Sequence, residues 1–317
     1  MQKHRTLIIG NGFDLDLGLA TTYRQFASSE LWPITNLDFL GSPLAQKLEE
    51  ERNRNSWFDI ENILWQYARE KELSDSELAS AIFGSEQRDR EVFNRVSDAL
   101  MKYIQVQELA KPKVDSVAAR VYKAIVENGY FDRIISFNYT DLNKIGSNLG
   151  CPDVQYSHVH GSVKDGHVIL GIADNNAVRR GYQYMYKTSD TFYKSSNIRF
   201  SLQNAEEVVF FGHSLGLQDY HYFQQFFLKQ SGDSLSEEDS IKITFFTRDA
   251  NSQEDMNNRL RDMIREKMNN FRDNNQVQFI RTADSNKTDL EDFLKHLKQT
   301  GREEQQRKLD SLASMLY

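Results

Sequence analysis

Four groups of polar residues carry the side chains with which this chain could bind a nucleotide. Each group comes directly after an apolar run of the kind that forms a buried strand. Parallel strands end at one edge of a sheet, and that edge holds the ligand crevice of open α/β proteins, so we expect the groups to meet. They are Asn11 with Asp14, Asn138 to Asp141, His160 with Gly161, and His213 and Ser214 with Asp219.

The first group lies in a glycine turn, Gly10-Asn11-Gly12, between the apolar run Leu7–Ile9 and a stretch with helical spacing. Glycine lets the backbone approach a ligand closely because it has no Cβ, and a helix N-terminus attracts phosphate. The turn therefore predicts nucleotide binding, with a plain strand-turn-helix as the alternative. Leu15 replaces the third glycine of G-x-G-x-x-G and no Gly-Lys-Ser/Thr follows, so the turn is not a Walker loop.

Two of the other groups also have structural alternatives. His158 and His160 flank Val159 on a predicted strand, where side chains alternate, so only one of the pair can face a site. A strand histidine can instead be a hydrogen-bonded structural residue, and Asn138 can cap a turn. No carboxylate cluster follows the two histidines at ligand spacing, so the pattern does not favour a metal site.

The last group contains the stretch Gly212–Gly216, Gly-His-Ser-Leu-Gly, which resembles the G-x-S-x-G nucleophile turn of the α/β-hydrolases. A hydrolase triad needs an acid and then a histidine later in the chain. Only His221 and His296 follow, and neither has that context. A serine nucleophile at Ser214 is therefore the less favoured interpretation.

Apolar runs alternate with helical spacing through much of the chain. This alternation predicts a Rossmann-like, three-layer α/β fold around a parallel sheet. The predicted strands are Leu7–Ile9, Phe131–Phe137, Val154–Gly161, His167–Gly171, Glu207–Phe211, Ile241–Phe246 and Val277–Ile280. Two of the predicted helices are Ser252–Phe271 and Leu290–Leu297.

Charged, amphipathic helical stretches fill residues 43–128. One of them has Ser56 as its predicted N-cap. Its apolar face is Trp57, Ile60, Leu64 and Tyr67. We therefore expect a nucleotide-binding domain of residues 1–42 and 129–298, an inserted helical subdomain of residues 43–128 and a C-terminal helical tail of residues 299–317.

Two further segments have a distinct composition. Residues 173–205 are polar and aromatic, which suits a lid or a small helical excursion. The C-terminal tail ends in a short apolar stripe, which could dock on its own domain or mediate self-association. The stripe is Leu309, Leu312, Met315 and Leu316.

The overall composition narrows the class of protein. With 317 residues, 39% hydrophobic and 27% charged, the chain is expected to be folded and soluble. Its net charge of −7 argues against a broad nucleic-acid surface, which needs clustered Lys and Arg. The single Cys151 permits neither an internal disulfide nor a cysteine-based zinc site. No apolar run reaches the ~18 residues of a membrane span and no signal peptide precedes the first strand, so we expect a cytoplasmic protein.

Five short motifs are spread over residues 7 to about 223. They are Gly10-Asn11-Gly12-Phe13-Asp14, Trp57-x-Asp59-x-Glu61, Phe137-Asn138-Tyr139-Thr140, His158-Val159-His160-Gly161 and Gly212-His213-Ser214-Leu215-Gly216-x-x-Asp219. In order and in content they resemble the bacteriophage abortive-infection AbiH family. The resemblance implies a role in anti-phage defence.

That family is in turn similar to the sirtuins and to the sirtuin-like NAD hydrolases of phage defence. The sirtuin glycine loop has the same frame as residues 10–23, with Gly18 in register. Asn138 corresponds to the first residue of the sirtuin Asn-x-Asp turn, and His160 to the histidine of its catalytic His-Gly. The strand end at Gly212 corresponds to the sirtuin Gly-Thr-Ser. The resemblance therefore implies a sirtuin-like fold that binds NAD.

The chain departs from the sirtuin pattern at three points. Asp14 stands where sirtuins have a serine, and Thr140 where they have an aspartate. The zinc ribbon of sirtuin deacylases needs four cysteines, and this chain has one. The docking of an acyl-lysine peptide is therefore not implied.

The resemblance implies hydrolysis of the N-glycosidic bond of NAD, which yields nicotinamide and ADP-ribose. Asn138 would hold the ribose or the attacking water, and His160 would act as the base. Asp14 would bind a ribose hydroxyl or serve as the second catalytic group. Gly10 and Gly12 would take the pyrophosphate, and Ser214 and Asp219 the adenosine side. The full set expected to contact NAD is Gly10, Asn11, Gly12, Phe13, Thr22, Tyr139, Gly212, Ser214 and Asp219.

Other functions stay open at this point. The chain could bind NAD or ADP-ribose without cleaving it and signal to a partner defence protein, or act as a homo-oligomer. An effector that acts on nucleic acid is a third hypothesis, against which the acidic composition argues. No metal is expected in any of the three.

Overall fold

A six-stranded parallel sheet forms the centre of the computed structural model, which describes residues 4–35, 38, 41–54, 58–73, 85–174, 177–194, 197–283 and 287–315. Its strands are β1 (His4–Ile9), β2 (Arg133–Ser136), β3 (Ser157–His158), β6 (Ala205–Phe211), β7 (Lys242–Thr247) and β8 (Gln276–Arg281). They lie in the order β3-β2-β1-β6-β7-β8, and every neighbouring pair is parallel. The chain builds outward from β1 to β3, then returns beside β1 and builds outward on the other side. In such a doubly wound sheet the ligand crevice lies where the order reverses, here between β1 and β6.

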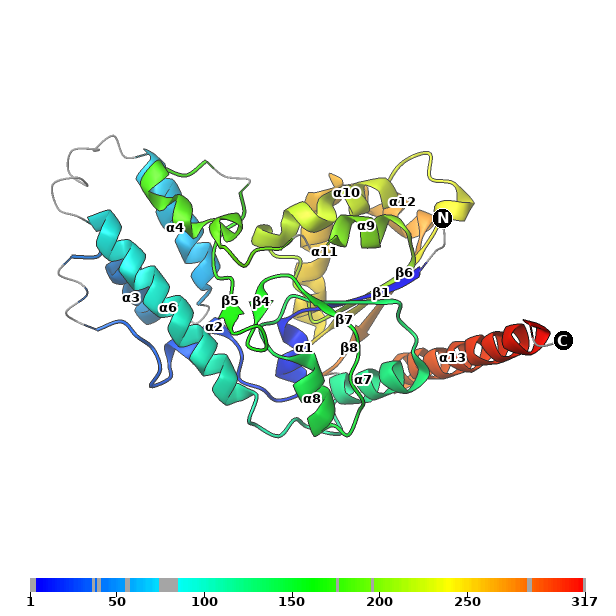
Figure 1. Cartoon of the computed structure of the whole chain (residues 1–317). Helices are drawn as coiled ribbons and strands as arrows, with labels where there is room; N and C mark the ends of the chain where they lie inside the picture. Colours follow the sequence, from blue (N-terminus) through cyan, green and yellow to red (C-terminus); the bar gives the residue numbers. More distant parts are fainter. Residues whose placement is uncertain are drawn as a thin grey trace.

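Helices cover both faces of the sheet (Figure 1). One face carries α7 (Val117–Asn128), α8 (Leu142–Asn148) and α13 (Lys287–Met315), and the other carries α9 (Ile198–Gln203), α10 (Tyr220–Gln230), α11 (Ala250–Ile264) and α12 (Met268–Asn274). Successive residues of β1 point to opposite faces, so Leu7 and Ile9 join the first core and Ile8 the second. Because both faces are buried, the strands form continuous apolar runs in the sequence. The predicted parallel α/β sheet is confirmed.

The second half of the predicted strand Val154–Gly161 leaves the sheet. Of this stretch only β3 joins the main sheet, by pairing with β2, and at Gly161 the backbone takes a φ of 69°. The chain then forms a separate antiparallel pair of β4 (Gly161–Ser162) and β5 (His167–Val168). The predicted strand His167–Gly171 therefore belongs to this small hairpin and not to the main sheet.

The helix predicted over Ser252–Phe271 is in fact two helices. α11 ends at Ile264, and Arg265 and Glu266 take left-handed φ angles of 52° and 66° before α12 begins. Neither glycine nor proline marks this break in the sequence, and the apolar spacing continues across it, so the sequence pattern predicts a single helix.

The closing helix is longer than predicted, because α13 continues without a break through residue 298 and extends away from the sheet (Figure 1). The apolar stripe predicted near residue 312 lies outside the residues whose side chains are described.

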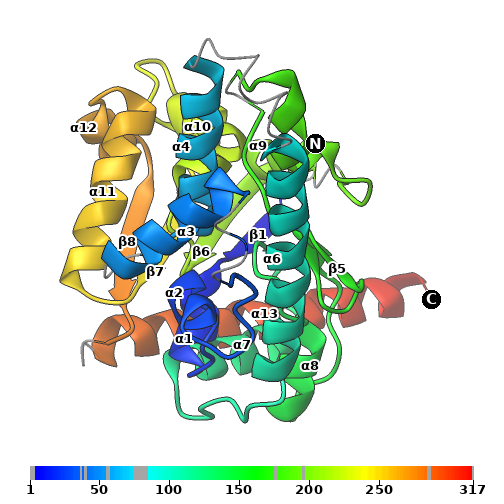
Figure 2. The ribbon, with the colours of Figure 1, turned by 90° about the vertical axis from the view of Figure 1, so that its left-hand side faces the viewer.

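A group of helices lies beyond the carboxyl ends of the strands. α3 (Pro43–Arg54), α4 (Ile60–Leu73) and α6 (Ser85–Gln107) stand in front of the sheet in Figure 2 and share a core with α2 (Tyr23–Ala27). The predicted face of α4 is confirmed for Ile60, Leu64 and Tyr67, which are buried, whereas Ser56 and Trp57 lie outside the described residues. The division of residues 43–128 from the sheet as a subdomain stays a prediction.

The described part of residues 173–205 contains the predicted helical excursion, made of the 3-10 helices η2 (Arg180–Met185) and η3 (Lys187–Ser189) followed by α9. Tyr182 and Met185 are fully buried in the core of the α3, α4 and α6 group. The Tyr182 hydroxyl donates a hydrogen bond to the buried Asp89 at 3.0 Å. This anchoring places Lys187, the first residue of η3, at the edge of the main sheet.

Candidate active site

The structure brings the four polar groups together at the carboxyl edge of the sheet. Gly10 and the short helix α1 (Asn11–Asp16) follow β1, Asn138 follows β2, His160 follows β3, and Gly212 follows β6. These are four adjacent strands on either side of the point where the strand order reverses. In a doubly wound sheet this is the position at which a ligand binds.

The glycines of the first and last groups interlock with each other. The Gly10 amide donates to Phe211 O, and the Gly12 amide to Gly212 O, both at 2.9 Å. A Cβ on Gly12 would lie 2.6 Å from Gly212 Cα, and one on Gly10 would lie 2.5 Å from His213 Cα. The observed role of these glycines is therefore the close approach of two loops, and their amides bind the chain itself in this conformation.

Gly212 is expected to be the least replaceable of these glycines. Its φ is 64°, and an added Cβ would lie 2.4 Å from Phe13 N, so Gly212→Ala should lower the free energy of unfolding by about 3 kcal/mol or more. Gly150→Ala is the matched control, because Gly150 also has a positive φ, 75°, but no atom within 4 Å of the added Cβ. Urea unfolding measures the stability of both variants. Equal losses of unfolding free energy would show that the close contact of Gly212 with the Gly12–Phe13 backbone does not add to the cost.

Asp14 holds Asn138 in place in a buried cluster. Asn138 Nδ2 donates to Asp14 Oδ1 at 2.8 Å and to Gly10 O at 3.2 Å, and the Thr140 hydroxyl donates to Asp14 Oδ2 at 2.9 Å. These acceptors fix the orientation of the amide, because both of its hydrogens are used. Among the described residues, Asn138 Oδ1 has no hydrogen-bond partner, so it is the atom available to a ligand.

Burial raises the pKa of Asp14 to about 7, and the hydrogen bonds from Thr140 and Asn138 offset only part of this effect. The Asp14 side chain is 1% exposed. Both of its oxygens are occupied by the chain, so its observed contacts are those of a residue that positions Asn138. The predicted contact of Asp14 with a ribose hydroxyl stays a prediction.

A second buried cluster surrounds His160. Its Nε2 lies 3.0 Å from Asp219 Oδ1 and 3.2 Å from Lys187 Nζ. Lys187 Nζ also lies 3.0 Å from Glu61 Oε2 in the first turn of α4, and His213 Nε2 lies 3.4 Å from Asp219 Oδ2. Asp219, expected on the adenosine side, thus contacts the predicted base and a second histidine.

The hydrogen bonds assign the protons of the two histidines. The Leu215 amide donates to His213 Nδ1 at 3.0 Å, so the proton of His213 is on Nε2, which faces Asp219. The Lys187 ammonium and His160 hold the pKa of Asp219 well below its usual value against the effect of burial, so Asp219 accepts only. With the Lys187 hydrogens directed to Glu61, His160 Nε2 carries the proton toward Asp219. Burial, with the Lys187 ammonium, lowers the pKa of His160 to about 4, so the ring is neutral at pH 7.

His160 Nδ1 is the unused acceptor of this arrangement. It is buried, and no group in the described part of the chain makes a hydrogen bond to it. In the neutral ring with the proton on Nε2, Nδ1 has a lone pair. A neutral imidazole that is held at one nitrogen and open at the other is the usual form of a general base.

Aromatic side chains enclose the same edge. The Phe137 ring lies against both His160 and His213, with centroid distances of 5.4 and 4.3 Å. On the other side the Tyr139 hydroxyl lies 3.2 Å from the Tyr23 hydroxyl. These apolar rings lower the polarity of the surroundings of the cluster, which strengthens its electrostatic interactions.

Several residues predicted to contact NAD have other observed roles. Phe13 packs in the core against Tyr122 and Phe211, and Thr22 caps α2 in a capping box with Gln25. Asn11 and Ser214 are exposed, and Asn11 accepts a hydrogen bond from Thr21. Their contacts with NAD stay predictions, whereas Asn138, His160, Asp14 and Asp219 lie within the two buried clusters.

Sequence reasoning did not select three members of the clusters. Glu61 belongs to the motif Trp57-x-Asp59-x-Glu61, so its spacing was a usable signal. His213 belongs to the last motif but was considered only beside Ser214. Lys187 lies in a polar stretch without any motif, and only its 3% exposure in the folded chain identifies it.

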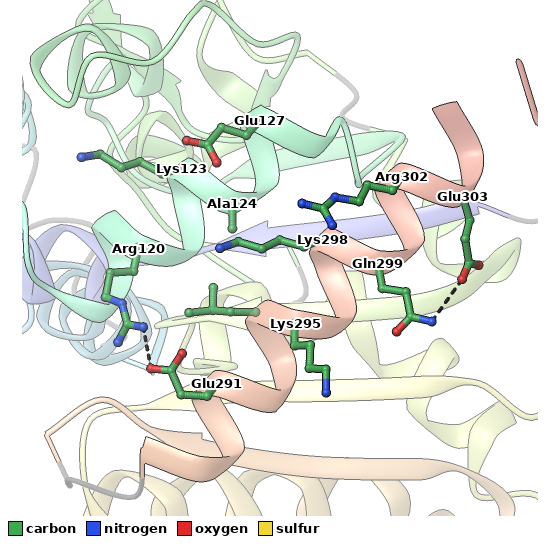
Figure 3. Close-up of a pocket in the computed structure, with 11 residues that line it drawn as sticks. Arg120, Lys123, Ala124, Glu127, Glu291, Lys295, Lys298, Gln299, Arg302 and Glu303 are labelled. Atoms are coloured by element: carbon green, nitrogen blue, oxygen red, sulfur yellow. Dashed lines mark hydrogen bonds and ion pairs between the residues drawn. The ribbon is translucent and has the colours of Figure 1, made fainter. Parts of the chain in front are cut away.

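A cavity of about 720 Å³ lies away from these clusters, between α7 and α13 (Figure 3). Arg120 pairs with Glu291 across it, and Lys123, Lys298 and Arg302 also line it. It shares no residue with the strand-end clusters, so it has no part in the chemistry considered at the sheet edge.

Among the described residues, no group of three or more His, Cys, Asp and Glu side chains could hold a metal ion. No helix in the described ranges is long and apolar enough to cross a membrane.

The doubly wound sheet, with its polar residues at the reversal of strand order, defines this chain as a Rossmann-like α/β protein. The family model described as "Bacteriophage abortive infection AbiH" matches residues 6–236. The chain therefore belongs to this family, which implies a role in anti-phage defence by abortive infection. The search of curated proteins finds no match.

Proposed function

We propose that this AbiH-family protein binds NAD at the carboxyl edge of β1, β2 and β6 and hydrolyses its N-glycosidic bond as a cytoplasmic defence enzyme. The observation that carries the proposal is His160, a buried neutral imidazole whose Nε2 faces Asp219 and whose Nδ1 has no partner in the described chain. The strand order supports the ligand class, since dinucleotides bind at such a reversal. The sirtuin-like arrangement of the site and the inserted helical subdomain are parts of this proposal.

In the proposed reaction the bond between ribose C1′ and the nicotinamide nitrogen breaks, and its electron pair leaves with neutral nicotinamide. A water molecule bonds to C1′, and its proton passes to His160 Nδ1. Asn138 Oδ1 accepts a hydrogen bond from that water or from a ribose hydroxyl. Because the transition state resembles an oxocarbenium ion, orientation and charge stabilisation contribute more than a strong nucleophile.

The second candidate is a sensor that binds NAD or ADP-ribose and signals to a partner defence protein. The burial of the two key side chains favours it, since His160 is 4% exposed and Asn138 6%. A site this closed has to open before a product can leave. Thermal stabilisation by NAD without release of nicotinamide would support the sensor.

The test is direct incubation of the purified protein with NAD and chromatographic measurement of free nicotinamide. His160→Gln and Asn138→Ala are each expected to lower the rate about 100-fold or more. The matched control is His167→Gln, because His167 also pairs with a carboxylate, Asp190, at 2.7 Å, but outside the clusters. Unchanged rates in both site variants would refute the assignments.

A further inference from the structure

Lys187 is the one ammonium in contact with His160 among the described residues, and it is almost inaccessible. Its side chain is 3% exposed, and its backbone amide donates to Ile172 O at 2.9 Å. The amine lies 3.0 Å from Glu61 Oε2, 3.2 Å from His160 Nε2 and 3.7 Å from Asp219 Oδ1. Glu61 comes from α4, so the contact joins the helical group to the sheet edge.

The charge of Lys187 opposes an effect that would disable His160. A carboxylate beside a histidine favours the imidazolium, in which both ring nitrogens carry protons and neither can accept another. Asp219 lies 3.0 Å from His160, and the ring would be charged more readily if that carboxylate acted alone. A fixed positive charge at 3.2 Å disfavours the second proton.

The Asp219 contact, and not the Lys187 contact, sets the position of the remaining proton, because an ammonium beside Nε2 can only donate. Lys187 donates to Glu61 Oε2 at 3.0 Å and lies at an ion-pair distance of 3.7 Å from Asp219 Oδ1, which leaves that oxygen able to accept from His160 Nε2. If the proton were on Nδ1, the Nε2 lone pair would face the Asp219 carboxylate at 3.0 Å, which is repulsive. The geometry therefore favours the Nε2–H form.

We infer that Lys187, oriented by Glu61, is a positioning residue that opposes protonation of His160, while Asp219 holds the single proton of the ring on Nε2. The role of His160 as base rests on the proposed function, but its protonation state does not. The charged and titratable groups facing His160 are Asp219, Lys187 and, across Asp219, His213. Glu61 acts on it through Lys187.

The experiment is a pH titration of the histidine rings by two-bond ¹H–¹⁵N NMR of the full chain. Loss of one signal in His160→Gln assigns the ring. In the wild type we expect a neutral ring with an unprotonated Nδ1 at pH 7. In Lys187→Met the titration midpoint of His160 should rise by at least about one unit, because the ammonium is lost and both carboxylates stay.

Two variants separate this effect from general damage. Lys144→Met also removes a lysine from a buried carboxylate, Glu108, at 3.1 Å, but away from His160, and should leave the His160 titration unchanged. Glu61→Gln keeps the ammonium and abolishes the titration of Glu61, whose pKa burial raises to about 7, so the midpoint of His160 should fall or stay the same. If Lys187→Met does not fold, a raised midpoint in Glu61→Gln still refutes the inference. So does a wild-type ring protonated on Nδ1, or a midpoint that Lys187→Met leaves in place.

Nicotinamide release supplies the second readout. The low-pH limb of the rate profile of Lys187→Met should move to higher pH by the same amount as the NMR midpoint, at least about one unit, because the rate follows the neutral form of His160. If the wild type releases no nicotinamide, the proposed function fails while the NMR titration still decides the role of Lys187. An unshifted pH profile in an active Lys187→Met would overturn the inference.

Discussion

Replacing Asp219 with asparagine is expected to lower nicotinamide release by about 10²- to 10⁴-fold with little change in fold. An amide cannot accept from both His160 Nε2 and His213 Nε2, which lie 3.0 and 3.4 Å from the two carboxylate oxygens. The Nδ2 of the new asparagine would donate to one of the two rings. At His160 this would move the proton to Nδ1 and remove the base, and a reversed tautomer of this kind costs several orders of magnitude in hydrolases that use an Asp–His pair.

The chain offers a matched control for this substitution. Asp190 accepts from His167 Nε2 at 2.7 Å, so Asp190→Asn breaks the same kind of pair outside the site. Its rate should stay within about twofold of the wild type. The initial rate of nicotinamide release, measured with circular dichroism and thermal unfolding on the same samples, separates lost chemistry from lost structure. Near-normal activity in Asp219→Asn would exclude His160 as the base.

Asp14→Asn is expected to stabilise the protein at pH 8 while leaving catalysis almost unchanged. Burial raises the pKa of Asp14 to about 7 from an ordinary value of 3.8, so the carboxylate that exists at pH 8 is unfavourable in the folded state. The asparagine can accept from Asn138 Nδ2 and donate to Thr140 Oγ1, which preserves both contacts. Each pKa unit corresponds to about 1.4 kcal/mol, so a rise of roughly three units gives a gain at pH 8 on the order of 4 kcal/mol.

The sign of the pH dependence follows from proton linkage. Between about pH 4 and pH 7 the folded wild type holds a proton on Asp14 that the unfolded chain has lost, so this residue lowers stability as the pH rises through that window. The difference between Asp14→Asn and the wild type should therefore be small at pH 4 and largest above pH 7. Burial also raises the pKa of Glu61 to about 7 and lowers that of His160 to about 4. Both residues are present in the wild type and in Asp14→Asn, so their contributions to the pH dependence cancel in the stability difference.

Urea unfolding at pH 4.5, 6 and 8 measures the stability difference, and nicotinamide release measures the rate. A rate within about threefold of the wild type would show that Asp14 positions Asn138. A loss of about 100-fold, with the stability gain intact, would instead make Asp14 a catalytic residue, which is one of the two roles that the resemblance to the sirtuins implies. Asp14→Ala is the complementary variant, since it removes the partner of Asn138 and should lower the rate in either case. A stability difference that does not change with pH would contradict the raised pKa.

The parallel sheet was predictable because its cause is local. A strand buried on both faces favours a continuous run of apolar residues, so Leu7–Ile9 and Val208–Phe211 are recognisable without any knowledge of their neighbours. The polar residues that end these runs were predictable in the same way. Parallel strands share a carboxyl edge, so Asn138 and His160 could be expected near Asp14 before the structure was known.

Boundaries that depend on tertiary packing were not predictable. Arg265 and Glu266 break a helix with left-handed backbone although neither is a glycine, so no residue type announces the turn. The β4–β5 hairpin likewise depends on the turn at Gly161, which a strand pattern does not distinguish from an ordinary glycine. Local propensity is a weak signal where packing of distant segments decides the backbone.

The amino-acid sequence by itself determined the fold class, the family motifs and the edge of the sheet at which the polar residues meet. Only the tertiary structure decided what those residues do there. It turned the glycines of the first motif toward another loop, placed Asp219 on His160, and brought Lys187 to Glu61 across 126 positions of the chain. The physical reason is that periodicity records which side chains are buried, whereas a buried charge depends on the partner that the fold places beside it.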